Sequence, residues 1–256
     1  MKIIIVSFFL IVNFGCAVGE KATGKGLTYW NSKEGKHRLL ESTYNVDFFR
    51  LANHFQPQPN GVVCGPTSGS IVLNTLINDR EKYMLPYNPL KASVAQQLPR
   101  NAEVRIKMFS PDNFSSGKAK KIKTEDQIFG KPINGKRDLG LQIRQLHEML
   151  LAHGVQSKLR IVEKTLSDKV IKNELIENLK SKNDYVVVNY KRLLLGQEGG
   201  GHISPLGAYH KPSDSFLVLD VNPDKYDWVW VKAEKLIQAM RSFDTVENRG
   251  YVLVSL

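Results

Sequence analysis

The fold is decided by residues 56–79, which read QPQPNGVVCGPTSGSIVLNTLIND. The part before Cys64 is rich in proline, asparagine and glycine, which predicts a loop. After Cys64, Gly65 and Pro66 open a segment whose apolar residues recur at helical spacing. Proline suits the first turn of a helix because its missing N–H has no partner there. The stretch therefore predicts a loop followed by a helix, with a cysteine at the helix N-terminus.

The periodicity of the apolar residues changes along the chain. It is helical in the first two thirds and typical of strands in the last third. We expect a loose leader at residues 20–33, helices at 44–55, 139–153 and 166–179, and strands at 185–190, 203–209, 216–221, 228–231 and 251–254. A chain of 256 residues suits one large domain or two lobes. The sequence predicts an α+β fold with a helical first lobe and an antiparallel sheet as the second lobe.

The composition limits the class of protein. Hydrophobic residues make up 42% and charged residues 24%, which excludes a disordered chain, a collagen and a disulfide scaffold. The net charge of +11 suits an anionic small molecule, nucleic acid or an anionic membrane surface without choosing among them. A lysine cluster has no interleaved aromatic residues, which favours a solvated loop and no nucleic-acid partner. Its members are Lys118, Lys120, Lys121 and Lys123.

The N-terminus resembles a secretory signal, since Lys2 precedes a short apolar run and small residues stand at 17–19. We expect a signal peptide at 1–19 and a catalytic domain at 20–256, exported to the periplasm or secreted. The apolar run is too short for a comfortable membrane span, so no span is expected in the mature chain. A lipoprotein anchored through Cys16 is the less favoured alternative.

Four residues stand in an order that indicates nucleophilic catalysis: Gln58, Cys64, His202 and Asp220. A helix N-terminus favours the thiolate of Cys64, and the Gln58 amide can donate to an oxyanion. His202 follows Cys64 by 138 residues, within the spacing of papain-like enzymes. Asp220 follows His202 by 18 residues across a hairpin and could orient the imidazole. Singly, these residues could be an inert cysteine, a turn-capping histidine and a turn aspartate; together they favour a Cys–His–Asp acyl-transfer site.

Two other stretches resemble known binding motifs but lack a required residue or spacing. Residues 130–137 nearly form a phosphate-binding loop, but Arg137 replaces the required serine or threonine. His147 and Glu148 begin a zinc-protease string, but His153 stands at the wrong spacing. We therefore expect neither a nucleotide site nor a protein-bound metal.

The candidate residues lie in blocks that resemble the phytochelatin synthases, glutathione γ-glutamylcysteinyltransferases of the papain-like class. The resemblance runs over residues 32–254 and is strongest around the histidine. The matching blocks are FFRL at 48–51, FQPQ at 55–58, VCG at 63–65, NYKR at 189–192, GHISPLGAYH at 201–210, LDV at 219–221 and RGY at 249–251.

The resemblance implies a papain-like two-lobed fold and a function in heavy-metal detoxification. It implies that Cys64 takes the γ-Glu-Cys unit of glutathione as a thioester and releases glycine. The acyl group then passes to another glutathione or to water. Arg192 is implied to contact a substrate carboxylate, and Gly201 to belong to the substrate site. No cofactor is obligatory, and cadmium or zinc would enter as thiolate complexes of the substrate.

Several alternatives stay open at this point. Short bacterial members of the family look mainly like glutathione hydrolases, and this sequence has no cysteine-rich segment after the catalytic part. It also has Val62 and Val63 where the family usually has an aromatic residue beside the cysteine. A papain-like peptidase of other specificity and a non-catalytic periplasmic protein that binds thiol peptides or their metal complexes are further alternatives. A homodimer is compatible with the sequence.

Overall fold

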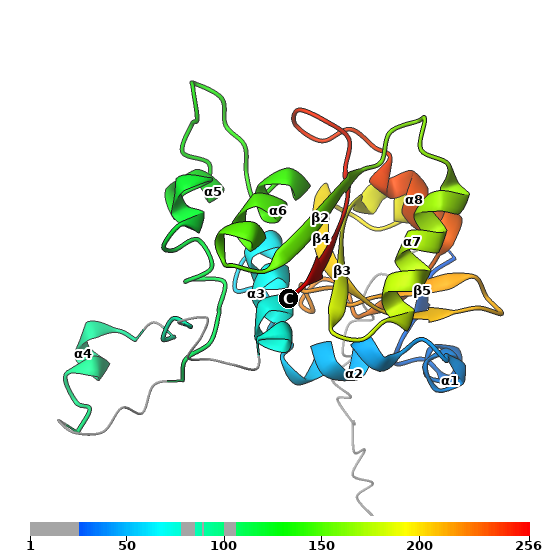
Figure 1. Ribbon diagram of the computed structural model, residues 1–256, viewed down its shortest axis with the longest axis horizontal. Helices are drawn as coiled ribbons and strands as arrows, with labels where there is room; N and C mark the ends of the chain where they lie inside the picture. The colour runs from blue at the N-terminus through cyan, green and yellow to red at the C-terminus, as the bar shows by residue number, and fades with distance from the viewer. Residues whose placement is uncertain (1–25, 78–84, 89, 100–105) are drawn as a thin grey trace, which may run out of the picture.

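The computed structural model describes residues 26–77, 85–88, 90–99 and 106–256, and shows an α+β fold around one antiparallel sheet (Figure 1). The described residues form seven strands in the order β1-β6-β5-β4-β3-β7-β2. The strands are β1 (Thr28–Tyr29), β2 (Gln156–Ile161), β3 (Asp184–Lys191), β4 (Gly201–His210), β5 (Ser215–Val218), β6 (Val229–Lys232) and β7 (Gly250–Ser255).

Helices cover both faces of this sheet. They are α1 (Lys33–Glu41), α2 (Val46–Asn53), α3 (Cys64–Leu76), α4 (Ala92–Ala95), α5 (Glu125–Ile128), α6 (Ile143–Ala152), α7 (Asp168–Lys180) and α8 (Ala233–Met240), with 3₁₀ turns η1 (Ala119–Lys121) and η2 (Arg192–Leu195). One buried cluster joins α3 and α6 to the sheet, and a second joins α7 and α8 to alternate residues of the same strands. Because both faces are covered, β3 reads as a nearly continuous apolar run.

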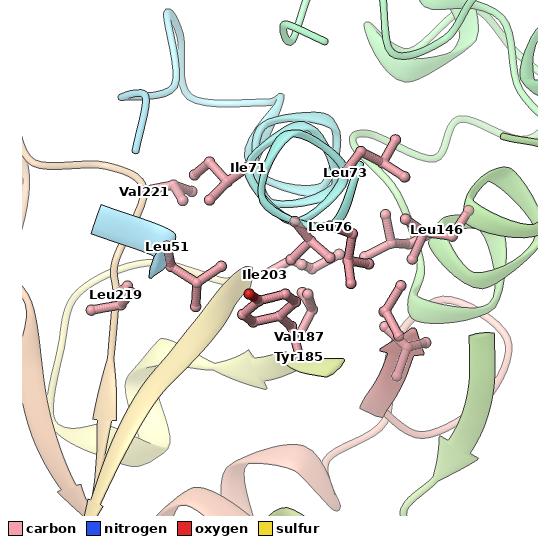
Figure 2. Close-up of a cluster of buried hydrophobic side chains, with 14 of the residues drawn as sticks. Leu51, Ile71, Leu73, Leu76, Leu146, Tyr185, Val187, Ile203, Leu219 and Val221 are labelled. Atoms are coloured by element: carbon pink, nitrogen blue, oxygen red, sulfur yellow. The ribbon is translucent and has the colours of Figure 1, made fainter. Parts of the chain in front are cut away.

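Helix α3 lies at the centre of the first cluster (Figure 2). Ile71 and Leu76 of this helix are almost completely buried, as are Val187 of β3 and Ile203 of β4. Gly69 allows the helix to approach its neighbours, because a Cβ there would lie 2.4 Å from the Phe114 ring. This packing fixes the helix, and therefore its N-terminal Cys64, against the strand that carries His202.

The register of β4 brings distant residues together. Tyr190 of β3 lies opposite His202, and Leu206 lies opposite Val218 of β5. The β4–β5 pairing is irregular between Leu206 and Ala208. The chain leaves β5 after Val218, so Asp220 follows the end of the strand that neighbours β4.

The expected helices and strands of the sequence are present, with shifts of a few residues at their ends. The α+β class is confirmed, but the sheet is not confined to the last third of the chain. Strand β1 lies in the expected leader and pairs with β6, and β2 follows α6 and pairs with β7. Such strands were missed because their stability comes from partners about 200 and 100 residues away rather than from local pattern.

The lysine cluster needs one correction, because Lys123 is fully buried whereas the other three lysines are exposed. The signal peptide expected at 1–19, with Cys16, lies outside the described residues. Within the described part of the chain, no helix is long and apolar enough to cross a membrane.

Candidate active site

Cys64 is the first residue of α3 and lies where the helix meets β4. The hydroxyl of Ser68, one turn into the helix, donates to the Ile203 carbonyl at 3.0 Å and fastens the helix to the strand. The adjacent Gly65 is required for close packing, because a Cβ there would approach the Leu141 side chain to 3.0 Å. The helix N-terminus, with its free N–H groups, favours a negative charge on the sulfur.

The thiol and the imidazole of His202 shift each other's protonation. Burial raises the pKa of Cys64, but its hydrogen bond to His202, the charge of His202, the Ile203 backbone and Arg192 outweigh burial, so the pKa is lowered. Burial lowers the pKa of His202 and Arg192 opposes its charge, but Asp220 and the bond to Cys64 outweigh them, so the pKa is raised. Both shifts favour a thiolate–imidazolium pair.

Asp220 holds the other side of the imidazole. Its Oδ1 lies 2.9 Å from Nε2 of His202, which leaves Nδ1 for Cys64. The backbone N–H of Asn222 donates to the same oxygen at 2.9 Å. Burial raises the pKa of Asp220, but the charges and hydrogen bonds of His202 and Arg192 outweigh it and hold the pKa well below its usual range. Asp220 is therefore an anion suited to orient and stabilise the imidazolium.

Tyr190 is a neighbour of this pair that the sequence analysis missed. Its ring lies edge-on to the imidazole of His202, with the ring centroids 5.7 Å apart. Burial raises the pKa of Tyr190 well above its ordinary value, and the charge of Asp220 raises it further. Tyr190 thus shields His202 with a neutral ring. The pairing of β3 with β4 was the signal that could have identified it, since residues opposite each other share a face.

Gln58 lies near the site, but its amide points elsewhere in this structure. Its backbone N–H donates to the Val221 carbonyl at 2.7 Å, which ties the loop to the segment after Asp220. Its side-chain Nε2 donates to the Asn60 carbonyl at 2.5 Å. The role of Gln58 as an oxyanion donor stays a prediction.

Arg192, which was expected to contact a substrate carboxylate, contacts other residues of the protein. Its guanidinium lies beside Asp220, with Nη2 2.9 Å from Oδ1 and Nη1 2.6 Å from Oδ2. Nη1 also donates to Oε1 of Gln197 at 3.0 Å. The side chain is buried and is not among the residues that line the cavity beside Cys64. In this arrangement its side-chain hydrogen bonds go to Asp220 and Gln197, and its expected contact with the substrate stays a prediction.

A cavity of about 250 Å³ opens beside Cys64. Gly201 lines it, and its lack of a side chain matters because a Cβ there would approach the Arg249 guanidinium to 2.9 Å. The lining residues are Gly61, Val62, Cys64, Leu139, Gly140, Leu141, Asn189, Gly201, His202, Ile203 and Asp244.

The polar wall of the cavity was not predicted from the sequence. The amide of Asn189 donates to Asp244 at 3.0 Å, and Nη2 of Arg249 donates to the other Asp244 oxygen at 2.8 Å. Burial lowers the pKa of Arg249 although Asp244 raises it. The matching blocks contained Asn189 and Arg249, but nothing local in the sequence linked them to Asp244.

A buried ion pair ties two walls of the cavity together. The Lys123 ammonium lies 2.8 Å from a carboxylate oxygen of Asp138, next to the lining residue Leu139. Thr245, next to Asp244, donates to the other Asp138 oxygen at 3.0 Å. Among the residues that the structure describes, no group of three or more histidine, cysteine or acidic side chains is arranged to hold a metal ion.

Comparison with known proteins gives one consistent result. The chain is similar to glutathione gamma-glutamylcysteinyltransferase 3 of Lotus japonicus, with 29% identity over 230 residues, 88% of this chain and 41% of the relative. It is 29% identical over 235 residues to glutathione gamma-glutamylcysteinyltransferase 1 of Arabidopsis thaliana, with the same coverage. A Schizosaccharomyces pombe enzyme of that name matches over 117 residues at 26% identity, covering 45% of this chain and 28% of the relative.

The chain thus spans less than half the length of these curated relatives. The family model for phytochelatin synthase matches residues 20–251, which include the whole constellation around Cys64. The chain belongs to the phytochelatin synthase family.

Proposed function

We propose that this protein is a glutathione γ-glutamylcysteinyltransferase that works through a thioester at Cys64. One observation carries the proposal: in a member of this family, a hydrogen-bonded Cys64–His202–Asp220 chain borders a cavity sized for a small ligand. The names of the relatives supply the substrate class. A protein that only binds thiol peptides would need neither a lowered thiol pKa nor an oriented imidazole.

The chemistry follows from the positions of the side chains. The Cys64 thiolate attacks the carbonyl carbon of the Cys–Gly amide of glutathione, and the C–N bond then breaks. The imidazolium of His202 gives its proton to the leaving amine of glycine. His202 then takes a proton from the amine of a second glutathione or from water as that nucleophile attacks the thioester carbonyl. The C–S bond breaks and Cys64 leaves as a thiolate, which restores the thiolate–imidazolium pair. Asp220 stabilises the imidazolium at each stage.

The polar wall of the cavity fits the γ-glutamyl end of the substrate. This end carries an ammonium and a carboxylate on one carbon. The Asp244 carboxylate lines the cavity, and the Arg249 guanidinium lies against Gly201 at its edge. We propose that this pair binds the two opposite charges, which would hold the scissile amide near Cys64.

The fate of the thioester is a separate part of the proposal. Val62 lines the cavity beside Cys64 and offers a smaller surface to an acceptor than an aromatic residue would. We therefore propose mainly hydrolysis at low glutathione, with transfer at high glutathione or when cadmium or zinc is bound by the substrate thiols. Measurement of the ratio of oligomer to γ-Glu-Cys across a glutathione titration tests this point, and oligomer as the major product at low glutathione would refute it.

The decisive experiment compares glycine release from glutathione by the wild type, Cys64→Ala and His202→Ala. His147→Ala is the matched control, since His147 contacts Ser157 outside the cavity. We expect both site variants to lose glycine release and a covalent γ-Glu-Cys adduct, measured by intact mass, while His147→Ala retains both. Full glycine release by folded Cys64→Ala would refute the thioester mechanism.

The remaining expectations are part of the same proposal. We propose a papain-like arrangement, because Cys64 lies on a central helix, His202 on strand β4 and Asp220 just after the end of the neighbouring strand β5. We also propose that the protein is exported, on the ground of the N-terminal sequence alone. Neither statement is needed for the chemistry at Cys64.

A further inference from the structure

Arg192 lies in the active site beside the His202 imidazolium, and several contacts fix the position of its side chain. Its backbone N–H donates to the Gly200 carbonyl at 2.9 Å, and its carbonyl accepts from the Gln197 N–H at 3.1 Å. Its guanidinium carbon lies 5.0 Å from the centroid of the Tyr226 ring. Together with the contacts to Gln197 and Asp220, these interactions leave the buried side chain little freedom.

We propose that Arg192 is a positioning residue that holds the Asp220 carboxylate through a two-point contact and balances its charge, so that Asp220 orients His202. The inference rests on the proposed function only for its kinetic readout. Nη2 donates a hydrogen bond to Oδ1 and Nη1 makes a charge contact with Oδ2, and the single ammonium of a lysine could not make both contacts from the same place. Oδ1 of Asp220 also accepts from His202 and Asn222, so the carboxylate is held from three sides.

The charge of Arg192 has a second consequence for the Cys64–His202 pair. It lowers the pKa of the Cys64 thiol, and it also lowers the pKa of the His202 imidazolium. The reactive thiolate–imidazolium state exists at pH values between the pKa of the Cys64 thiol and the pKa of the His202 imidazolium. Arg192 therefore shifts both limits of this state toward lower pH. Loss of its charge should move both limits toward higher pH, whereas a loose or partly unfolded site would not move them together.

Other charged or titratable groups also face the pair and must stay unchanged in the test. Asp220 and Tyr190 act on it directly. Asp244 lines the cavity and Arg249 lies against Gly201. A substitution at Arg192 leaves each of these residues in the chain, and among them Asp220 loses its contact with the guanidinium.

The test measures the rate of iodoacetamide alkylation at Cys64 against pH, identified by peptide mass so that Cys16 does not interfere. The variants are Arg192→Met, which removes the charge, and Arg192→Lys, which retains it but loses the two-point contact. Lys191→Met is the matched control, because it removes a neighbouring positive charge on β3 that is not in the Asp220 network. Circular dichroism establishes that each variant is folded, and glycine release from glutathione gives kcat and KM.

For Arg192→Met we expect both limits of the alkylation profile to rise by about half a unit to one unit, which lowers the rate near the acidic limit by about three- to tenfold. Lys191→Met should keep the wild-type profile. If Arg192→Met does not fold, Arg192→Lys decides alone: we expect the wild-type profile, a kcat lowered by about tenfold or more and an unchanged KM.

Two results would overturn the proposal. One is an unchanged alkylation profile in folded Arg192→Met. The other is a raised KM with unchanged kcat in Arg192→Lys, which would place the guanidinium on the substrate. Alkylation requires no glutathione, so a shifted profile in a protein that releases no glycine would refute the proposed function and leave the role of Arg192 intact.

Discussion

Replacement of Asp47 by asparagine should stabilise this protein at neutral pH. Asp47 lies in the first turn of α2, the helix that leads into the loop of Gln58. Its side chain is 1% exposed, and neither carboxylate oxygen has a hydrogen-bond partner in the part of the chain that the structure describes. Burial, and to a smaller extent the charge of Asp184, raise its pKa from 3.8 to about 8, although Arg50 acts to lower it.

The magnitude follows from proton linkage. The unfolded chain loses the Asp47 proton near pH 3.8, and the native protein keeps it to about pH 8. Between these values the native state binds the extra proton, so stability falls as the pH rises. At about 1.4 kcal/mol per unit, the loss reaches about 4 kcal/mol at pH 7 and about 6 kcal/mol above pH 8. Asparagine carries no such proton and escapes this loss.

The assay is denaturant unfolding of the wild type and Asp47→Asn at several pH values between 4 and 9. Asp112→Asn is the control, since Asp112 is exposed. We expect the stability advantage of Asp47→Asn to grow from pH 4 to pH 8 and then become constant, while the control shows no such trend. An advantage that is independent of pH, or that shrinks as the pH rises, would refute the reasoning.

Two further predictions concern His202, Asp220 and Glu174. Asp220→Asn should lower kcat for glycine release less than His202→Ala does, because the thiolate–imidazolium pair survives with a weaker partner. If purified Asp220→Asn is slower than purified His202→Ala, Asp220 is excluded as the orienting group. Glu174 accepts from Arg160 and from Tyr251 at 2.7 Å, and these contacts hold its pKa at about 2. Glu174→Gln should therefore destabilise the protein at pH 7. The difference in the free energy of unfolding between the wild type and this variant should vanish as the pH falls from 4.5 through about 2. A difference that persists at pH 2 would contradict this assignment.

The local pattern of the sequence was sufficient for the elements that carry the reacting groups. The breaker-rich loop before Cys64, the helix after it and the strands around His202 all have signals within a few residues. The register of the hairpin is different, because the β4–β5 pairing shifts between Leu206 and Ala208 and a local pattern gives no sign of that irregularity. The order Gln58, Cys64, His202, Asp220 was visible because the roles in acyl transfer demand particular residue types.

Features that depend on neighbours far away in the chain could not be predicted from the sequence. The two-residue strand β1 has almost no pattern of its own and exists through its pairing with β6. Lys123 resembled an exposed lysine, and only its contact with Asp138 explains its burial. Asp47 gave no sign that it would be buried without a hydrogen-bond partner in the described structure.

The sequence by itself determined the α+β class, the cysteine at a helix N-terminus and the residue types of the candidate catalytic chain. These depend on local periodicity and on the chemistry of single side chains. Only the tertiary structure decided that the Arg192 guanidinium lies against Asp220, and that Asn189, Asp244 and Gly201 share one cavity. The physical reason is that hydrogen bonds and charge interactions act over a few ångströms in space. The residues concerned are 12 to 55 positions apart in the chain, so their contacts follow from sheet register and packing.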